Sequence, residues 1–300
     1  MKKKTYLIAL MAMALTLGSC SDNENGIGGE TSKYITVSTS IGNMTRVATD
    51  ANGGQTFEEG DEISVYAWTG APTVAPETRE RVVNNAINKL TNGAWVSTPQ
   101  MLWKNNRDKH YFIGVYPTAA ISDLSAGEYT FDANKQTESD LLVAVNKDGL
   151  SYNADEQQTV PLTFTHVMAK LVVNLTYKNQ WGGIPTVEKV VVGNAAKEAI
   201  INYLTKVVTP STTTKEDFSL PEITENTKYV SVIIPQEDVK QLTIVIGGKN
   251  FVYDNGTPFK LESGKITTVN LEVGRDEIKL GDVKITNWED GSTFSGEALN

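Results

Sequence analysis

The feature that most constrains the fold is an alternation of apolar and polar residues that recurs along the chain after residue 33. In Tyr34–Ile41 (YITVSTSI), the residues at positions 35, 37, 39 and 41 fall on one face. Glu62–Thr69 (EISVYAWT) divides its residues between two faces in the same way. Side chains alternate across a β-strand with a period of two, whereas a helix repeats every 3.6 residues. The pattern therefore predicts many short strands, as in β-sandwiches and barrels.

Further candidate strands are rich in Val, Ile, Thr and aromatic residues and are bounded by turn-forming residues. They are His110–Tyr116, Leu141–Val145, Val160–Phe164, Met168–Tyr177, Val187–Val192, Tyr229–Ile234, Leu242–Ile246, Phe251–Tyr253, Ile266–Val273 and Glu277–Ile285. Arg79–Leu90 has apolar residues at helix-like spacing, but turn signals lie within it and after it. A strand leading into a hairpin is favoured there. Thr209–Lys215 reads as a loop, and Gly247–Asn250 as a hairpin turn.

The length of 300 residues predicts one large domain or two ordinary ones. The polar run Asn153–Gln158 and then Pro161 precede a fresh apolar stretch. We therefore expect an N-terminal β-sandwich domain over residues 34–160 and a C-terminal one over residues 161–300.

The first residues have the features of a lipoprotein signal peptide, expected over residues 1–19. A basic start precedes the apolar run Tyr6–Leu17, which is too short to span a bilayer. The following LGSC sequence ends at Cys20, the thiol that would accept a lipid. The alternatives are a lone buried cysteine or an ordinary cleaved signal. Residues 20–33 are polar and Gly-rich and predict a flexible tether. Within it, Asp22 and Glu24 resemble a surface-export signal of lipoproteins, the alternative being ordinary linker composition.

Composition excludes several classes of function. The net charge is -9, and removal of the three leader lysines changes it to -9 minus 3, or -12. Such an acidic chain repels phosphate backbones, so we expect no nucleic-acid partner. With one cysteine and two histidines, the chain has no internal disulfide and no Cys- or His-cluster metal site. We expect no cofactor and no bound metal.

Several groups that could carry chemistry are better explained structurally, so we expect no enzyme. The acidic run at Glu58–Glu62 lacks the spacing of a calcium loop. His110 and His166 are expected to be hydrogen-bonded structural residues. Nothing in the sequence brings Glu58 and Glu59 together with Asp155 and Glu156, which a glycosidase pair would require. The five tryptophans could stack on sugars, but packing in the core is the commoner role.

Several stretches of the sequence occur in an order that points to a known family. They are Met44–Val47, Phe57–Tyr66, Trp95 and Trp103 with Tyr111–Pro117, Leu162–Leu171, and Ile285–Trp288. The LGSC sequence at residues 17–20 resembles the lipobox of bacterial lipoproteins. Behind it, these stretches resemble the fimbrillin-like lipoproteins of the Bacteroidetes, which include type V pilus subunits. The resemblance implies an all-β chain with two tandem transthyretin-like β-sandwich domains behind a lipoprotein signal peptide.

The resemblance also implies how such a chain assembles. An arginine-specific protease would cut between Arg46 and Val47, and the first strand would then be displaced by a strand from a neighbouring subunit. The displaced strand would carry Ile35, Val37 and Ile41 on its inner face. A vacated edge with exposed apolar side chains is a template for strand addition. The alternative for Arg46 is a solvated loop charge.

Two functions remain open at this point. The first is a structural or adhesive pilus subunit (stalk, tip or anchor) at the outer membrane and cell surface. Its partners would be other pilus subunits, the membrane through a lipid anchor, and a host or bacterial surface ligand. The second is a non-polymerising surface lipoprotein that binds glycan or protein ligands. The donor strand would be Glu277–Ile285 or the tail of residues 289–300, which has few apolar residues.

Overall fold

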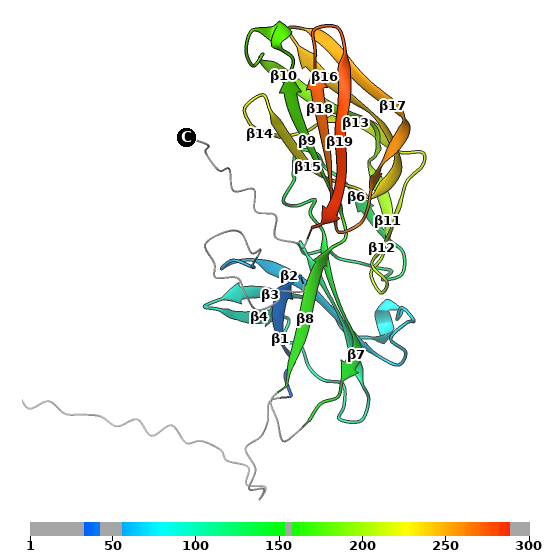
Figure 1. The fold of residues 1–300 in the computed structure, drawn as a ribbon. Helices are drawn as coiled ribbons and strands as arrows, with labels where there is room; N and C mark the ends of the chain where they lie inside the picture. The colour runs from blue at the N-terminus through cyan, green and yellow to red at the C-terminus, as the bar shows by residue number, and fades with distance from the viewer. Residues whose placement is uncertain (1–32, 43–55, 154–157, 289–300) are drawn as a thin grey trace, which may run out of the picture. The chain divides into compact units, whose positions relative to one another are not determined.

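The computed structural model describes residues 33–42, 56–153 and 158–288, which all belong to one unit, Thr31–Asn300 (Figure 1). These residues form nineteen strands. The only helical turns among them are two short 3₁₀ segments, Thr78–Glu80 and Asn179–Trp181. No helix in this part of the chain is long and apolar enough to cross a membrane. The prediction of an all-β fold is confirmed.

The first half of the chain builds a seven-stranded sheet in the order β1-β8-β7-β5-β2-β3-β4. Its strands are β1 (Thr36–Ile41), β2 (Glu62–Thr69), β3 (Arg81–Thr91), β4 (Ala94–Thr98), β5 (His110–Tyr116), β7 (Leu142–Leu150) and β8 (Thr159–His166). All neighbours in this sheet are antiparallel except β1 and β8, which run parallel. The sheet curls so that its two edges approach each other. This is seen at Tyr34, just before β1, which forms a β-bridge with Leu102, just beyond β4.

Three further sheets complete the unit. The strands of the five-stranded sheet, in order, are β14 (Glu222–Thr224), β15 (Lys228–Ile233), β9 (Ala169–Tyr177), β18 (Lys265–Val273) and β19 (Ile278–Asn287). Those of the four-stranded sheet are β13 (Lys215–Ser219), β10 (Val187–Ala196), β16 (Gln236–Ile246) and β17 (Lys249–Leu261). Those of the three-stranded sheet are β12 (Val207–Pro210), β11 (Glu198–Asn202) and β6 (Gly127–Thr130).

Strand β2, in the seven-stranded sheet, is buried on both of its faces. Its residues Ile63, Val65 and Ala67 pack in a smaller apolar cluster inside the curled sheet. Its residues Tyr66 and Trp68 point the other way, into a larger cluster shared with the other three sheets. The alternation read from the sequence therefore separates the contributions of β2 to two different cores.

The boundary between sheets lies beyond the expected division at residue 160. Strand β8 pairs with β1 over residues 159–164 and with β7 over residues 164–166, and β9 begins at Ala169 in the five-stranded sheet. Strand β6, from the first half, pairs with β11 from the second. The division into domains of residues 34–160 and 161–300 remains a prediction.

Hairpins occur where the sequence carries turn signals. The ambiguous segment after Arg79 forms strand β3, and Asn92 and Gly93 turn it into β4 with φ values of 52° and 74°. Gly247 and Gly248 connect β16 to β17 with φ values of 58° and 72°. Positive φ at both central residues gives the turn twist that joins two antiparallel strands. The loop expected over Thr209–Lys215 is shorter, because β12 and β13 extend into both of its ends.

Candidate functional site: the first-strand groove

Strand β1 lies in a groove with two walls, which we call the first-strand groove. On one side, β1 pairs in parallel with β8 from Thr36 opposite Thr159 to Ile41 opposite Phe164 (Figure 1). On the other side, the start of the strand meets residues 101–103. There the N–H of Ile35 donates to the carbonyl of Met101 at 3.0 Å. The strand is thus held by hydrogen bonds on both edges.

The inner face of β1 contributes to the smaller core. Ile35 is 1% exposed and Val37 is 6% exposed, and both belong to the apolar cluster inside the curled sheet. Ile41 is half-buried and packs against the same cluster. The structure therefore brings together the three residues that the sequence placed on the inner face of the displaced strand. Whether the strand is displaced remains a prediction.

The outer face of β1 is polar. The hydroxyl groups of Thr36 and Thr159 lie 3.1 Å apart, and Ser40 donates to Thr163 at 3.2 Å. Ser38, between them, is exposed. These contacts are open to water, so we expect them to contribute little to the free energy of binding of the strand.

An aromatic cluster covers the C-terminal end of β1. The ring of Phe57 stands edge-on to Trp95, Tyr116 and Phe164, with centroid distances of 5.1 to 5.3 Å. The N–H of Gly42 donates to the carbonyl of Phe164 at 2.7 Å and fixes the strand end. Both described ends of the segment that contains Arg46 are therefore held against the groove.

The backbone of β8 faces β1 along the whole groove. Because the Phe164 carbonyl bonds to Gly42, alternation places the N–H and C=O groups of Val160 and Leu162 on the same side. Pro161, which has no N–H, then faces away from β1. On that side β7 pairs only with residues 164–166. Within the described chain, β1 is the only strand that pairs with residues 159–163.

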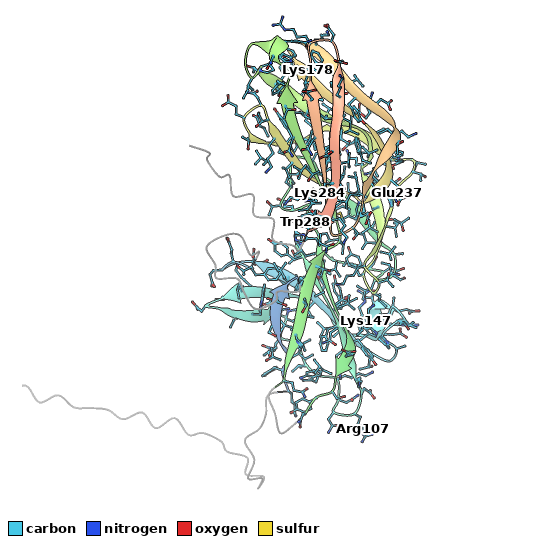
Figure 2. The ribbon with its side chains drawn as sticks, in the orientation of Figure 1. Arg107, Lys147, Lys178, Glu237, Lys284 and Trp288 are labelled. Carbon is cyan, nitrogen blue, oxygen red and sulfur yellow. The ribbon has the colours of Figure 1, made fainter. Side chains whose placement is uncertain are left out.

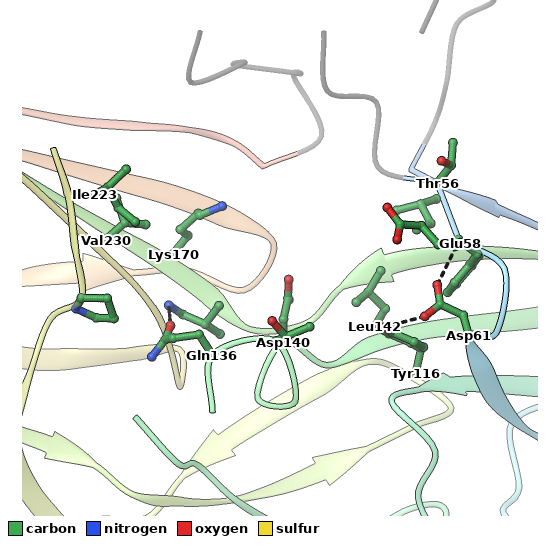
Figure 3. A pocket seen from close by; sticks show the side chains of 15 residues that line it. Thr56, Glu58, Asp61, Tyr116, Gln136, Asp140, Leu142, Lys170, Ile223 and Val230 are labelled. Atoms are coloured by element: carbon green, nitrogen blue, oxygen red, sulfur yellow. Dashed lines mark hydrogen bonds between the residues drawn. The ribbon is translucent and has the colours of Figure 1, made fainter. Parts of the chain in front are cut away.

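A pocket of about 630 Å³ opens beside the end of β1, lined by Ile41, Phe57 and residues from β9, β15 and nearby loops (Figure 3). Asp61 accepts a hydrogen bond from the Tyr116 hydroxyl at 3.2 Å and from the Glu58 N–H at 2.7 Å. Burial, with the negative charge of Asp61, raises the pKa of Tyr116. These three residues of the lining are thus hydrogen-bonded to one another.

Lys170 also lines this pocket. Its ammonium nitrogen lies 4.9 Å from the ring centroid of Trp288. Burial lowers the pKa of Lys170, and the negative charge of Asp140 opposes that shift. The amine is therefore placed by packing against an aromatic ring, which is a common structural setting for a cation.

The two histidines have structural settings. His110 is fully buried; its Nε2 accepts from the Lys104 N–H at 3.1 Å, and its Nδ1 lies 3.1 Å from the Asp108 carbonyl. His166 lies 2.7 Å from Asp140 and stacks on Trp288, which follows the end of β19 (Figure 2). Both rings are thus held by neighbouring groups of the protein.

The acidic run at residues 58–62 also has local partners. Glu59 accepts from the Asn92 N–H at 2.6 Å, and Glu62 pairs with Lys89 at 3.0 Å. Among the described residues, no cluster of three His, Cys, Asp or Glu side chains has the arrangement of a metal site. These carboxylates stabilise turns and strands.

Several sequence-predicted sites lie outside the described residues. These are the lipidation site Cys20 and the cleavage site at Arg46 and Val47. Asp155 and Glu156, for which the sequence indicates no catalytic role, lie outside them too. Conversely, the structure reveals features of the groove that sequence reasoning missed. Residues 101–103 form its second wall, and Thr39 contacts Trp95. No sequence signal links positions so far apart in the chain.

The fold is shared with bacterial proteins whose structures have been solved. A candidate cell adhesion protein from Bacteroides uniformis has a TM-score of 0.63 at 18% identity, covering 86% of this chain and 100% of that one. One from Bacteroides ovatus has 0.62 at 17%, covering 85% and 98%. A fimbrial protein from Bacteroides vulgatus has 0.51 at 13%, covering 84% and 99%. At these identities, the likeness shows a shared fold.

The sequence also matches a family directly. Residues 45–288 match the fimbrillin-like family, and the chain belongs to that family. The match covers most of the described residues and confirms the resemblance seen in the sequence. Among curated protein sequences, none matches this chain.

Proposed function

We propose that the chain is a structural or adhesive subunit of a bacterial surface pilus rather than an enzyme. It is exported as a lipoprotein through Cys20, anchored at the outer membrane and cut by an arginine-specific protease between Arg46 and Val47. It then joins other pilus subunits by strand addition in the first-strand groove. Family membership and the fimbrial and adhesion proteins that share the fold support this role.

The observation that carries the proposal is the position of β1. It inserts Ile35 and Val37 into a core, yet after a cut at Arg46 only non-covalent contacts would hold it. Each buried aliphatic side chain contributes roughly 1.5–3 kcal/mol, so cleavage alone leaves the strand in place. A strand from a neighbouring subunit replaces it by exchange and re-forms the same hydrogen bonds.

Loss of the strand would also expose β8. Residues 159–163 pair with β1 and with no other strand among those described. An empty groove would therefore leave unpaired backbone groups beside the apolar side chains of Val160 and Leu162. This makes a filled groove the stable state both before and after assembly.

The alternative is a non-polymerising lipoprotein that binds glycan or protein ligands. An exposed aromatic platform would favour it. Trp68, Trp103 and Trp288 are buried, and Trp95 and Trp181 are half-buried. The tryptophans therefore serve packing, and no observation on the described surface favours this function over the first.

The test is limited trypsin treatment of the purified precursor, followed by gel analysis without boiling and N-terminal sequencing. We expect a new N-terminus at Val47 and a ladder of oligomers. Arg46→Ala should keep its fold but form no ladder. The matched control is Arg107→Ala. Arg107 is an exposed loop residue, and Figure 2 shows it at the end of the unit opposite to Lys178. A cut precursor that stays monomeric, or an Arg46→Ala protein that assembles like wild type, would overturn this mechanism.

A further inference from the structure

One inner position of β1 differs in chemistry from the others. Positions 35, 37 and 41 carry aliphatic side chains, whereas Thr39 carries a hydroxyl group. The indole N–H of Trp95 donates to that hydroxyl at 3.0 Å. A hydroxyl at this position is therefore part of how β1 fits the groove.

The position of the indole does not depend on β1 alone. Trp95 belongs to β4, where it pairs with Leu90, and its ring stands edge-on to Phe57 with an interplanar angle of 84°. The ring also packs against the smaller core. Its N–H is thus held in place by the rest of the groove and points at whatever strand occupies it.

An indole nitrogen can only donate a hydrogen bond. When a strand fills the groove, it shields the indole N–H from water. If that strand offers no acceptor, the hydrogen bond to water is weakened without replacement, and the filled groove is less stable. A valine at position 39 would match the shape of threonine but provide no acceptor. A serine would keep the acceptor and lose only a methyl group.

We propose that Trp95 selects the strands that can enter the first-strand groove by requiring a hydrogen-bond acceptor at the position of Thr39. The inference rests on the proposed strand exchange. The partner is an extended segment of another subunit that carries aliphatic residues at the positions of Ile35, Val37 and Ile41. Between the last two, it carries a serine, threonine or other acceptor side chain.

The outer face of the strand discriminates much less. The hydroxyl groups of Thr36 and Ser40 bond to β8 in exposed positions, where water can replace either partner. Ser38 is also exposed. Selection therefore depends on the inner face, where the groove limits access of water.

The test uses trypsin-cut full-length protein and a fluorescent peptide with the sequence of residues 33–42. Uptake is followed by anisotropy as the peptide replaces the resident strand. We expect Thr39→Val in the peptide to weaken uptake by up to about tenfold, the upper end of the range for one neutral hydrogen bond. Thr39→Ser should stay within about threefold, and Ser38→Val is the matched control that should change nothing.

A second trypsin-cut protein, the Trp95→Phe variant, separates the role of Trp95 from that of threonine itself. Trp95→Phe removes the donor, so it should take up the wild-type and Thr39→Val peptides equally well. If neither trypsin-cut protein takes up the wild-type peptide, the proposed strand exchange fails. If it enters and Thr39→Val enters equally, or if Trp95→Phe keeps the preference, selection by Trp95 is wrong while strand exchange stands.

Discussion

Phe164 lies directly against Gly114 inside the seven-stranded sheet: a Cβ atom on Gly114 would lie 2.6 Å from the Cζ of Phe164. Phe164 is also the register partner of Ile41 and contacts Phe57. The missing side chain on β5 therefore makes room for the ring that supports the end of β1. Gly114 thus matters for the first-strand groove, although it lies two strands away from β8.

We expect Gly114→Ala to lower the free energy of unfolding by about 1–3 kcal/mol, the usual cost of overpacking a tight core. Urea denaturation measures it. Phe164→Leu frees space around the ring position, so the double variant should be less destabilised than the sum of the two single changes. Strict additivity would show that the two residues do not compete for the same space.

His110 should make stability depend on pH. Burial lowers the pKa of His110, while its hydrogen bond to the Asp108 carbonyl opposes that shift. As pH falls through the ordinary histidine value of about 6.5, the unfolded chain takes up a proton that the folded chain excludes. The free energy of unfolding therefore decreases from pH 6.5 downward until the folded pKa is passed.

The measurement is urea denaturation of wild type and His110→Gln between about pH 7.5 and 5.5. Glutamine keeps an acceptor for the Lys104 N–H but does not titrate. We expect a smaller loss of stability with acid in the variant. Equal slopes in the two proteins would show that His110 does not contribute to the pH dependence.

Much of the strand content could be predicted because individual strands carry strong local patterns. Glu62–Thr69 and His110–Tyr116 have the bounds in the structure that the sequence predicts. Gly127–Thr130 and Glu222–Thr224 were missed because strands of four and three residues are too short to show a period. Such strands are specified by their neighbours rather than by their own composition.

The candidate site, too, has a part that the sequence could predict and a part that it could not. Alternation alone placed Ile35 and Val37 on an inner face, because the period of a strand is local. The parallel pairing of β1 with β8 and the contact of Thr39 with Trp95 join positions far apart in sequence. No local pattern specifies such pairings, since they depend on how the whole sheet closes.

Cys20 should determine membrane attachment. Cys20→Ala removes the thiol that would receive the lipid, so we expect no incorporation of labelled fatty acid. The protein should leave the membrane fraction or accumulate as an unprocessed precursor. Cys20 is the only cysteine, so no other thiol can substitute. Ser19→Ala, which keeps a small residue before the cysteine, is the matched control and should retain labelling; labelling of Cys20→Ala would contradict the lipoprotein prediction.

Ile35 should anchor the first strand in the uncut protein. Its side chain is 1% exposed and packs in the smaller core. Ile35→Ala leaves a cavity, so the free energy of unfolding should fall by about 2–5 kcal/mol. Ser38→Ala, on the exposed face of the same strand, should change it by less than about 0.5 kcal/mol. Urea denaturation measures both. Equal, small effects would mean that β1 is a peripheral strand, and the groove it occupies could not then drive assembly.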